Sequence, residues 1–211
     1  MRQYSILLAT IAAVNFAATA QTRPVQFPKL SKSLDSLAYV DQWPMQRLLQ
    51  QLPDSAGRNL VDVEKENFAR HQPVLEAIVK KYGYPGIRQV GEKSAENFWL
   101  LVQHADAHPA FQRQVLRLML TEVKSKNASP THYAYLTDRV AKNSGQPQEY
   151  GTQLKYTGYV GKDYSRAVAV PVSLRDPKNV DKRRAAIGME PLQQYLDRMA
   201  ELMKQMNKPK P

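Results

Sequence analysis

The sequence predicts a mainly α-helical fold: a single helical-bundle-like domain of about six or seven helices with a small β-hairpin late in the chain. Three observations support this prediction. Apolar residues recur at spacings of three and four over most of the chain, as on the buried face of an amphipathic helix. Short segments with proline and glycine separate these stretches, as between the antiparallel helices of a bundle. The alternating pattern of strands appears between residues 154 and 172.

The N-terminus has the layout of a cleavable secretory signal peptide. Arg2 precedes an apolar run that ends in Ala18-Thr19-Ala20, the small-residue pattern that signal peptidases accept. The run contains Asn15 and is shorter than the ~20 residues that a membrane-spanning helix needs. We therefore expect residues 1–20 to be removed and the remainder to be a soluble envelope domain, periplasmic or extracellular, without a transmembrane segment. An uncleaved membrane anchor is the alternative.

The remaining chain is predicted to form one domain. Residues 21–32 are expected to be a flexible lead-in, residues 33–206 a single mainly helical domain, and residues 207–211 a basic tail. The chain has no cysteine, which excludes disulfides and a cysteine nucleophile. A domain of this length is large enough to bury a substantial core.

The charge is strongly positive and unevenly spread. Lysine and arginine number 30 against 19 aspartate and glutamate residues, and the excess lies in the second half of the chain. The leading interpretation is a solvated basic face, and the partner is not identified by the sequence. Because such a surface attracts anions, an anionic ligand or an envelope surface bound by the C-terminal half is the alternative. Nucleic acid is not expected, because no aromatic residues alternate with the basic run.

Five helical stretches are predicted up to residue 145. Each has apolar residues three and four apart, as Leu75 and Ile78 are in the second stretch. Pro44 predicts a kink in the first helix or its division into two. Ser129 followed by Pro130 has the order of an N-cap and a first helical residue. The predicted helices cover residues 33–52, 60–82, 94–107, 111–126 and 129–145.

The pattern changes after residue 145. Pro171 makes the second of two predicted strands an edge strand. Asp176 followed by Pro177 predicts an N-cap and the start of a helix that ends at Gly188. The predicted elements are a loop over residues 145–153, strands over 154–159 and 166–172, and helices over 176–188 and 190–206.

The helix predicted over residues 94–107 is the most informative. Nearly its whole circumference is apolar, which is typical of a buried central helix. Gln103, His104 and Asp106 are nevertheless part of it. Buried polar groups without partners cost roughly 1–3 kcal/mol each, so the loop over residues 145–153 is expected to supply partners. Gln103, His104, Asp138 and Tyr150 are therefore expected to lie in one cluster.

Four motifs occur in order along most of the chain, from about Leu34 to Tyr195. They are Val102-Gln103-His104-Ala105-Asp106, Thr137-Asp138-Arg139-Val140-Ala141, Gln148-Glu149-Tyr150-Gly151-Thr152-Gln153 and Asp176-Pro177-Lys178-Asn179-Val180-Asp181-Lys182-Arg183-Arg184. With these motifs the chain resembles an uncharacterised bacterial family, domain of unknown function 6624. The resemblance implies one bacterial domain. It implies no activity, substrate or catalytic residue.

His104 is the candidate general base, with Asp106, Asp138 or another carboxylate orienting its ring. Arg139 is the candidate residue for binding an anionic group of a substrate. The other candidate binding residues are Gln103, Gln148, Tyr150, Thr152, Gln153, Arg183 and Arg184. The alternative interpretation is a structural network in which the polar groups hold the central helix against the loop.

His104 and His108 have the spacing of a zinc-binding helix, in which two histidines four residues apart share one face. The glutamate that serves as general base in that motif is missing, because Ala105 stands in its place. Pro109 directly after His108 also predicts the end of the helix. We therefore expect neither a metal site nor a cofactor.

Two functions remain open from the sequence. The leading interpretation is an exported binding or interaction module whose polar core is structural. The alternative is a cleft enzyme of hydrolase or lyase type that uses His104 as general acid or base. The sequence has no Gly-x-Ser-x-Gly nucleophile motif. An open cleft beside His104 would favour the enzyme, whereas a sealed polar core would favour the binding module.

Overall fold

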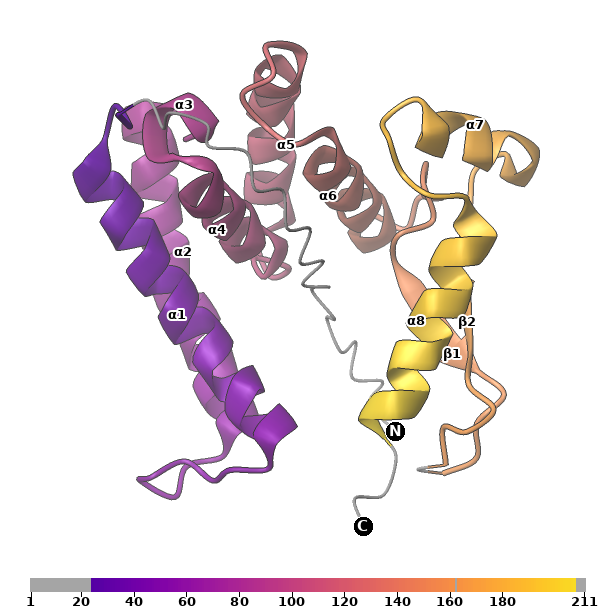
Figure 1. Cartoon of the computed structure of the whole chain (residues 1–211). Coiled ribbons are helices and arrows are strands. Elements are labelled where there is room, and N and C mark those ends of the chain that lie inside the picture. Colours follow the sequence, from indigo (N-terminus) through magenta and orange to yellow (C-terminus); the bar gives the residue numbers. More distant parts are fainter. Residues whose placement is uncertain (1–23, 162, 208–211) are drawn as a thin grey trace.

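The computed structural model describes residues 24–161 and 163–207. These residues form eight α-helices, one short 3-10 helix and a two-stranded antiparallel sheet (Figure 1). The predicted mainly helical fold with a late hairpin is confirmed. The signal peptide expected over residues 1–20 lies outside the described residues, as do residues 21–23 and 208–211. None of the described helices is long and apolar enough to cross a membrane.

Helices α1 (Pro28–Gln50) and α2 (Leu60–Tyr82) form a long pair at one side of the molecule (Figure 1). The bounds of α2 are those predicted. Helix α1 begins at Pro28, so the last five residues of the expected lead-in, 28–32, are helical. Proline is favoured in the first turn because it has no N–H that would remain unpaired there.

Pro44 lies inside α1, which is a single helix and is not divided as the sequence suggested. Proline has no N–H to donate to the carbonyl four residues earlier, which here belongs to Val40. The side-chain amide of Asn67, on α2, donates to that carbonyl at 2.9 Å. The neighbouring helix thus supplies the hydrogen bond that the proline removes, and the helix continues.

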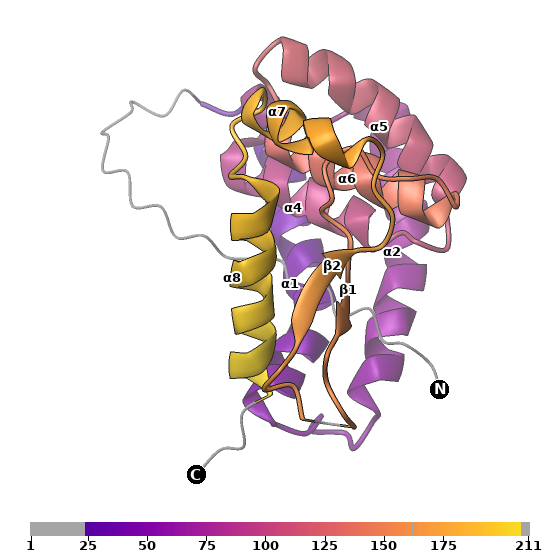
Figure 2. The ribbon, with the colours of Figure 1, turned by 90° about the vertical axis from the view of Figure 1, so that its right-hand side faces the viewer.

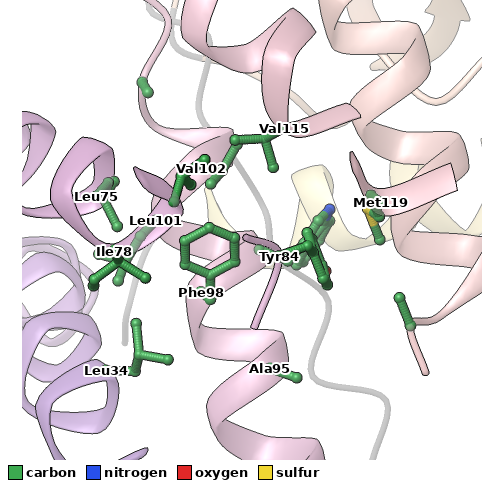
Figure 3. Packing of buried hydrophobic residues seen from close by; sticks show 14 of the residues in the cluster. Leu34, Leu75, Ile78, Tyr84, Ala95, Phe98, Leu101, Val102, Val115 and Met119 are labelled. Carbon is green, nitrogen blue, oxygen red and sulfur yellow. The ribbon is translucent and has the colours of Figure 1, made fainter. Parts of the chain in front are cut away.

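Helix α4 (Glu92–Gln103) crosses the middle of the N-terminal helices and follows a short helix, α3 (Ile87–Val90), that the sequence did not predict. Figure 3 shows Phe98 of α4 surrounded by side chains of its neighbours, among them Leu34 of α1 and Ile78 of α2. Helix α4 ends at Gln103, four residues before the predicted end. His104 is therefore the C-cap residue of α4 and does not lie within the helix.

Helices α5 (Pro109–Lys124) and α6 (Pro130–Asn143) pack against each other and complete the main core. The predicted start of α6 is confirmed, because the hydroxyl of Ser129 accepts a hydrogen bond from the N–H of His132 at 3.2 Å. His104 and His108 do not share one helix face, although their spacing of four would allow this on a continuous helix. His108 is the N-cap residue of α5, and a turn separates it from the end of α4.

The C-terminal part forms a second, smaller core. Strands β1 (Leu154–Thr157) and β2 (Val168–Pro171) pair in antiparallel register, and α8 (Leu192–Met206) lies beside β2 (Figure 2). The buried members of this core are Ala169, Tyr195, Met199 and Ala200. The hairpin and α8 lie at the opposite side of the molecule from α1 (Figure 1).

The segment before α8 differs from the prediction. A 3-10 turn, η1 (Pro177–Asn179), and a short helix, α7 (Val180–Ala185), replace one continuous helix. Asp176 was expected as an N-cap, but its φ of 43° places it in the left-handed region and its side chain accepts no backbone N–H. Its carboxylate accepts from the side-chain amide of Asn179 at 2.8 Å instead.

Candidate functional site

His104 is paired with a buried carboxylate, that of Asp41 on α1. The Nδ1 atom of His104 lies 2.6 Å from Oδ2 of Asp41, whose exposed fraction is 1 %. Asp41 lies on the core-facing stripe of α1, between Ala38 and Pro44. The helix thereby carries an acidic group into the core, where it meets the end of α4.

Three side chains surround the Asp41 carboxylate. Besides His104, the amide of Gln42 donates to Oδ2 at 2.8 Å, and Nδ1 of His71 lies 3.4 Å from Oδ1. Burial raises the pKa of Asp41, but the bonds with His104 and His71 outweigh this and hold the pKa below its usual value. An ionised Asp41 requires a proton on Nδ1 of His104, so in the neutral imidazole Nε2 is the basic nitrogen.

His104 lines an open cavity of about 340 Å³, within the size range of small-molecule sites. The Nε2 atom of His104 has no hydrogen-bond partner in the described part of the chain. The ring of Phe68, on α2, packs on the imidazole with 4.8 Å between ring centroids. The cavity, hereafter the cleft, is lined by Gln42, Met45, Glu64, Lys65, Phe68, Ala69, His104, Ala105, Asp106, Ala107, His108 and Arg139.

Helix α2 adds a second carboxyl group to the cleft. Glu64 is half-buried, and burial raises its pKa above the usual value although the charge of His104 opposes the shift. Asp41 adds to the rise through repulsion between like charges. Glu64 therefore keeps its proton to a higher pH than an ordinary glutamate does. One cleft thus contains an oriented imidazole and a carboxyl group with a raised pKa.

Arg139 of α6 forms another wall of the cleft. Its Nη1 donates to the carbonyl of Gln103 at 2.9 Å and to Oδ2 of Asp106 at 2.7 Å. Burial raises the pKa of Asp106, but the charge of Arg139 and the hydrogen bond from Asn143 outweigh it, so the pKa of Asp106 lies below its usual value. The pair closes the end of α4 and fixes the turn that carries His104.

Gln112 of α5 reinforces the same turn. Its amide donates to the carbonyls of Val102 and Gln103 and to Oδ1 of Asp106, at 3.1, 3.4 and 3.1 Å. The last carbonyls of a helix have no partner within the helix. Here Gln112 and Arg139 supply those partners, so His104 is held by side chains from two further helices.

The loop over residues 145–153, which was expected to contact His104, contacts Asp138 instead. Asp138 is fully buried, and its carboxylate accepts hydrogen bonds from the N–H groups of Glu149, Tyr150 and Thr152 at 2.8, 3.0 and 2.8 Å. Asp138 does not line the cleft. The cluster expected of Gln103, His104, Asp138 and Tyr150 therefore divides in two, with His104 turned towards α1 and α2 and Asp138 towards the loop.

Gln148 and Gln153 close this loop on itself. The side-chain oxygen of Gln148 accepts from the N–H of Gln153 at 2.7 Å, and its amide donates to the carbonyl of Gln153 at 2.9 Å. The carbonyl of Thr152 accepts from the hydroxyl of Tyr195 at 3.1 Å. We call Asp138, residues 148–153 and the side chains bonded to them the loop network.

Two arginines expected to bind an anion belong to the loop network. Arg183 donates from Nε to the carbonyl of Glu149 at 2.8 Å, and Arg184 from Nη1 to the carbonyl of Tyr150 at 2.7 Å. Arg184 is fully buried and lies over the ring of Tyr195, 5.1 Å from its centroid. Both arginines hold backbone carbonyls, and neither lines the cleft.

The cleft therefore brings together only part of the predicted site. His104, Asp106 and Arg139 line it, whereas the side chain of Gln103 is buried in the core and contributes its carbonyl alone. Sequence reasoning missed Asp41 and Glu64. Within the described ranges, no group of three histidine, aspartate or glutamate side chains is arranged to hold a metal ion.

A second depression of about 320 Å³ lies on α1 and α2, with Tyr39, Trp43 and Arg70 in its lining. Its lining holds no carboxylate or imidazole.

Comparisons with known proteins give a family and nothing more specific. A family model described as a family of unknown function (DUF6624) matches residues 28–206. No curated protein and no solved structure matches the chain. The matched range contains every residue of the cleft and of the loop network.

Proposed function

Because the chain belongs to the family of unknown function DUF6624, its activity must be inferred from the cleft, and we propose that it is an acid–base enzyme of hydrolase type. The observation that carries this proposal is the 2.6 Å contact between His104 and the buried Asp41 at the wall of an open cleft. A carboxylate on Nδ1 fixes the ring and stabilises the imidazolium that forms when Nε2 accepts a proton.

The reaction follows from the groups that line the cleft. No serine, threonine or cysteine lines it, so water is the nucleophile. His104 takes a proton from water at Nε2 while the water oxygen attacks an electrophilic carbonyl or phosphoryl centre. Glu64 gives its proton to the leaving group. Transfer of a proton from the imidazolium to the Glu64 carboxylate, directly or through water, restores the starting state. A lyase would use the same base on a C–H bond and is the alternative.

A binding module is the second candidate, and it was the leading interpretation from the sequence. The loop network supports it in part, because those polar groups are buried and serve structure. The cleft argues against it. Binding alone gains little from a carboxylate that orients an imidazole, and burying Asp41 is costly unless its charge is used.

The test is the reactivity of His104 towards diethylpyrocarbonate, which acylates an accessible neutral imidazole nitrogen. Peptide mapping by mass spectrometry gives the rate at each of the four histidines. We expect His104 to react readily although its side chain is only 8 % exposed. Asp41→Asn should slow His104 by about tenfold, because the ring loses the carboxylate that fixes its orientation and stabilises the positive charge that develops on acylation. The exposed His108 provides the internal control and should keep its rate.

Two results would overturn the proposal. If His104 resists modification while His108 reacts fully, the cleft does not present a free imidazole nitrogen. If Asp41→Asn leaves the rate at His104 unchanged, the carboxylate does not activate the ring, and the binding module becomes the better description.

We also propose that the chain is exported to the periplasm or the medium. The support is the sequence of residues 1–20, with its basic residue, apolar run and small-residue site. Intact-mass measurement of protein from its native host should give a chain that begins at Gln21. A mass that retains Met1 to Ala20 would contradict export with cleavage.

A further inference from the structure

Arg139 presents unused hydrogen-bond donors at the cleft. Its exposed fraction is 2 %, and only Nη1 is engaged, by Gln103 and Asp106. Its Nε is buried without a partner, and Nη2 makes no hydrogen bond to any described residue. A buried donor without a partner costs about 1–3 kcal/mol. Nε is enclosed by protein, so Nη2 is the free donor of Arg139 that an acceptor on a ligand in the cleft can reach.

The charges near Arg139 favour an anion over a neutral acceptor. The single negative charge of Asp106 is shared among Arg139, Asn143 and Gln112. The guanidinium of Arg139 is permanently charged, so its free donor binds an oxyanion more strongly than a neutral acceptor. Lys65, on α2, is a second cation in the lining of the cleft and is also paired with Asp62 at 2.9 Å.

We propose that the substrate carries an oxyanion group, a phosphate or a carboxylate, which Nη2 of Arg139 binds beside His104. This inference rests on the proposed function for the view that the occupant of the cleft is a substrate. Asp106 follows His104 by two residues in the same turn, and Arg139 is bonded to that turn. An oxyanion held by Arg139 is therefore placed in the cleft that contains the base. Arg139 selects the substrate, and His104 acts on it.

Arg139→Lys separates ligand binding from folding. The structural role of Arg139 uses one nitrogen, Nη1, and a lysine ammonium offers donors to both acceptors of that nitrogen. Lysine has no second nitrogen equivalent to Nη2. The variant is therefore expected to fold while it loses the ligand contact.

Asp106→Asn shifts affinity in the opposite direction. It removes the negative charge next to Arg139, so an anion meets a less neutralised guanidinium. Lys178→Gln, on the exposed 3-10 turn, is the matched control, since it removes a positive charge far from the cleft lining.

The experiment is isothermal titration of the chain from Gln21 to Pro211 with inorganic phosphate and, separately, with acetate at constant ionic strength. We expect Arg139→Lys to weaken binding at least tenfold, a loss of about 1.4 kcal/mol. Asp106→Asn should strengthen it several-fold, and Lys178→Gln should leave it unchanged. Tighter binding of phosphate than of acetate indicates a phosphorylated substrate, and the reverse order a carboxylate.

Unchanged binding in Arg139→Lys, or binding of neither anion by the wild type, overturns the inference. If Arg139→Lys fails to fold, Asp106→Asn decides, because unchanged or weaker binding there contradicts the role of Arg139. The proposed function fails separately, on the reactivity of His104 measured without added anion.

Discussion

At the scale of single residues, Asp41 organises the cleft through its two carboxylate oxygens. One oxygen accepts from His104 and Gln42, and the other faces His71. His71 does not line the cleft, and its contact with Asp41 at 3.4 Å makes it a positioning residue for the carboxylate. Two histidines share one acid, and of these two only His104 lines the cleft.

Asp41→Asn is predicted to lower stability in a pH-dependent manner. The pKa of Asp41 is lower in the folded than in the unfolded protein, so its contribution is present above the unfolded value of about 4 and is lost as pH falls through the folded pKa. At pH 7 the variant should be less stable by about 2 kcal/mol. Thermal melts between pH 2 and 7 should show this gap closing below pH 4. A gap that stays constant would contradict the prediction, and Asp62→Asn, an exposed residue, is the control.

His132, on α6, gives the stability of the fold a second pH dependence at its contact with Trp99 of α4. Burial lowers the pKa of His132 to about 4, and its ring stacks on Trp99 with centroids 4.0 Å apart. The unfolded chain binds a proton more readily, so stability is lost as pH falls from about 6.5 towards 4, by on the order of 3 kcal/mol.

His132→Phe is predicted to flatten the stability profile between pH 6.5 and 4, because phenylalanine keeps the stack and cannot be protonated. Urea unfolding at several pH values measures the slope for both proteins. Equal slopes would show that the imidazole of His132 stays neutral or charged alike in both states.

At the scale of elements, α1 and α2 are joined by a hydrogen bond from Asn67 that is needed because α1 contains Pro44. Pro44 leaves the carbonyl of Val40 without its helical donor, and Asn67 replaces that donor from the neighbouring helix. The two helices are thereby fixed in register beside the cleft, where α1 supplies Asp41 and α2 supplies Glu64.

A double-mutant cycle tests this dependence. Asn67→Ala should cost about 1–2 kcal/mol because it leaves the carbonyl of Val40 without its donor from α2. In the background of Pro44→Ala, an N–H at position 44 can satisfy that carbonyl, so Asn67→Ala should cost about 1 kcal/mol less. Chemical denaturation of the four proteins gives the coupling. Additive effects would mean that Asn67 acts through packing alone.

The elements were predictable where periodicity and capping agree, as in α2 and at Ser129 before α6. They were not where a tertiary contact decides the boundary. Helix α4 ends at Gln103 because Arg139 and Gln112, distant in sequence, satisfy its last carbonyls. No local sequence pattern at residues 104–107 indicates that end, so the sequence predicts a longer helix with His104 in its interior.

The site was predictable for His104 and Arg139 and not for their partners. Asp41 and Glu64 do carry a signal, since each is a charged residue on an apolar stripe: Asp41 is seven residues after Leu34, and Glu64 is four after Leu60. Charged residues rarely occupy such positions unless they are paired. The orientation of the Asp138 side chain depends on how α6 rotates against the loop, which sequence does not reveal.

At the scale of the whole molecule, α6 joins the cleft and the loop network through two adjacent side chains, those of Asp138 and Arg139. Arg139 faces the cleft and the end of α4, whereas Asp138 faces the loop network and, through it, α8. The N-terminal helices carry the proposed chemistry. The C-terminal hairpin and helices are attached through the loop and through Tyr135 of α6, whose ring packs on Tyr195.

Asp138→Ala is predicted to release the loop and leave the cleft intact. Three backbone N–H groups lose their acceptor, so global stability should fall by about 3–5 kcal/mol. Hydrogen exchange should show lost protection over residues 148–153 and retained protection in α1 and α2. Glu149→Gln keeps the backbone N–H groups of the loop and their acceptor, and weakens only the ion pairs of its side chain with Arg175 and Arg183, so it is the control and should have the smaller effect. Retained protection of the loop in Asp138→Ala would contradict this attachment.

The adjacency of Asp138 and Arg139 also limits how α6 can change in length. Successive residues of an α-helix are turned by about 100° from each other, so each of these side chains has its own direction. Removing or adding one residue between Ser129 and Asp138 would turn both away from their partners together. Most single exchanges on the exposed face of α6 would be tolerated. Insertion or deletion of one residue would break the contacts of Asp138 with the loop and those of Arg139 with the end of α4 together. Natural variants of this helix should therefore differ by substitution and keep its length.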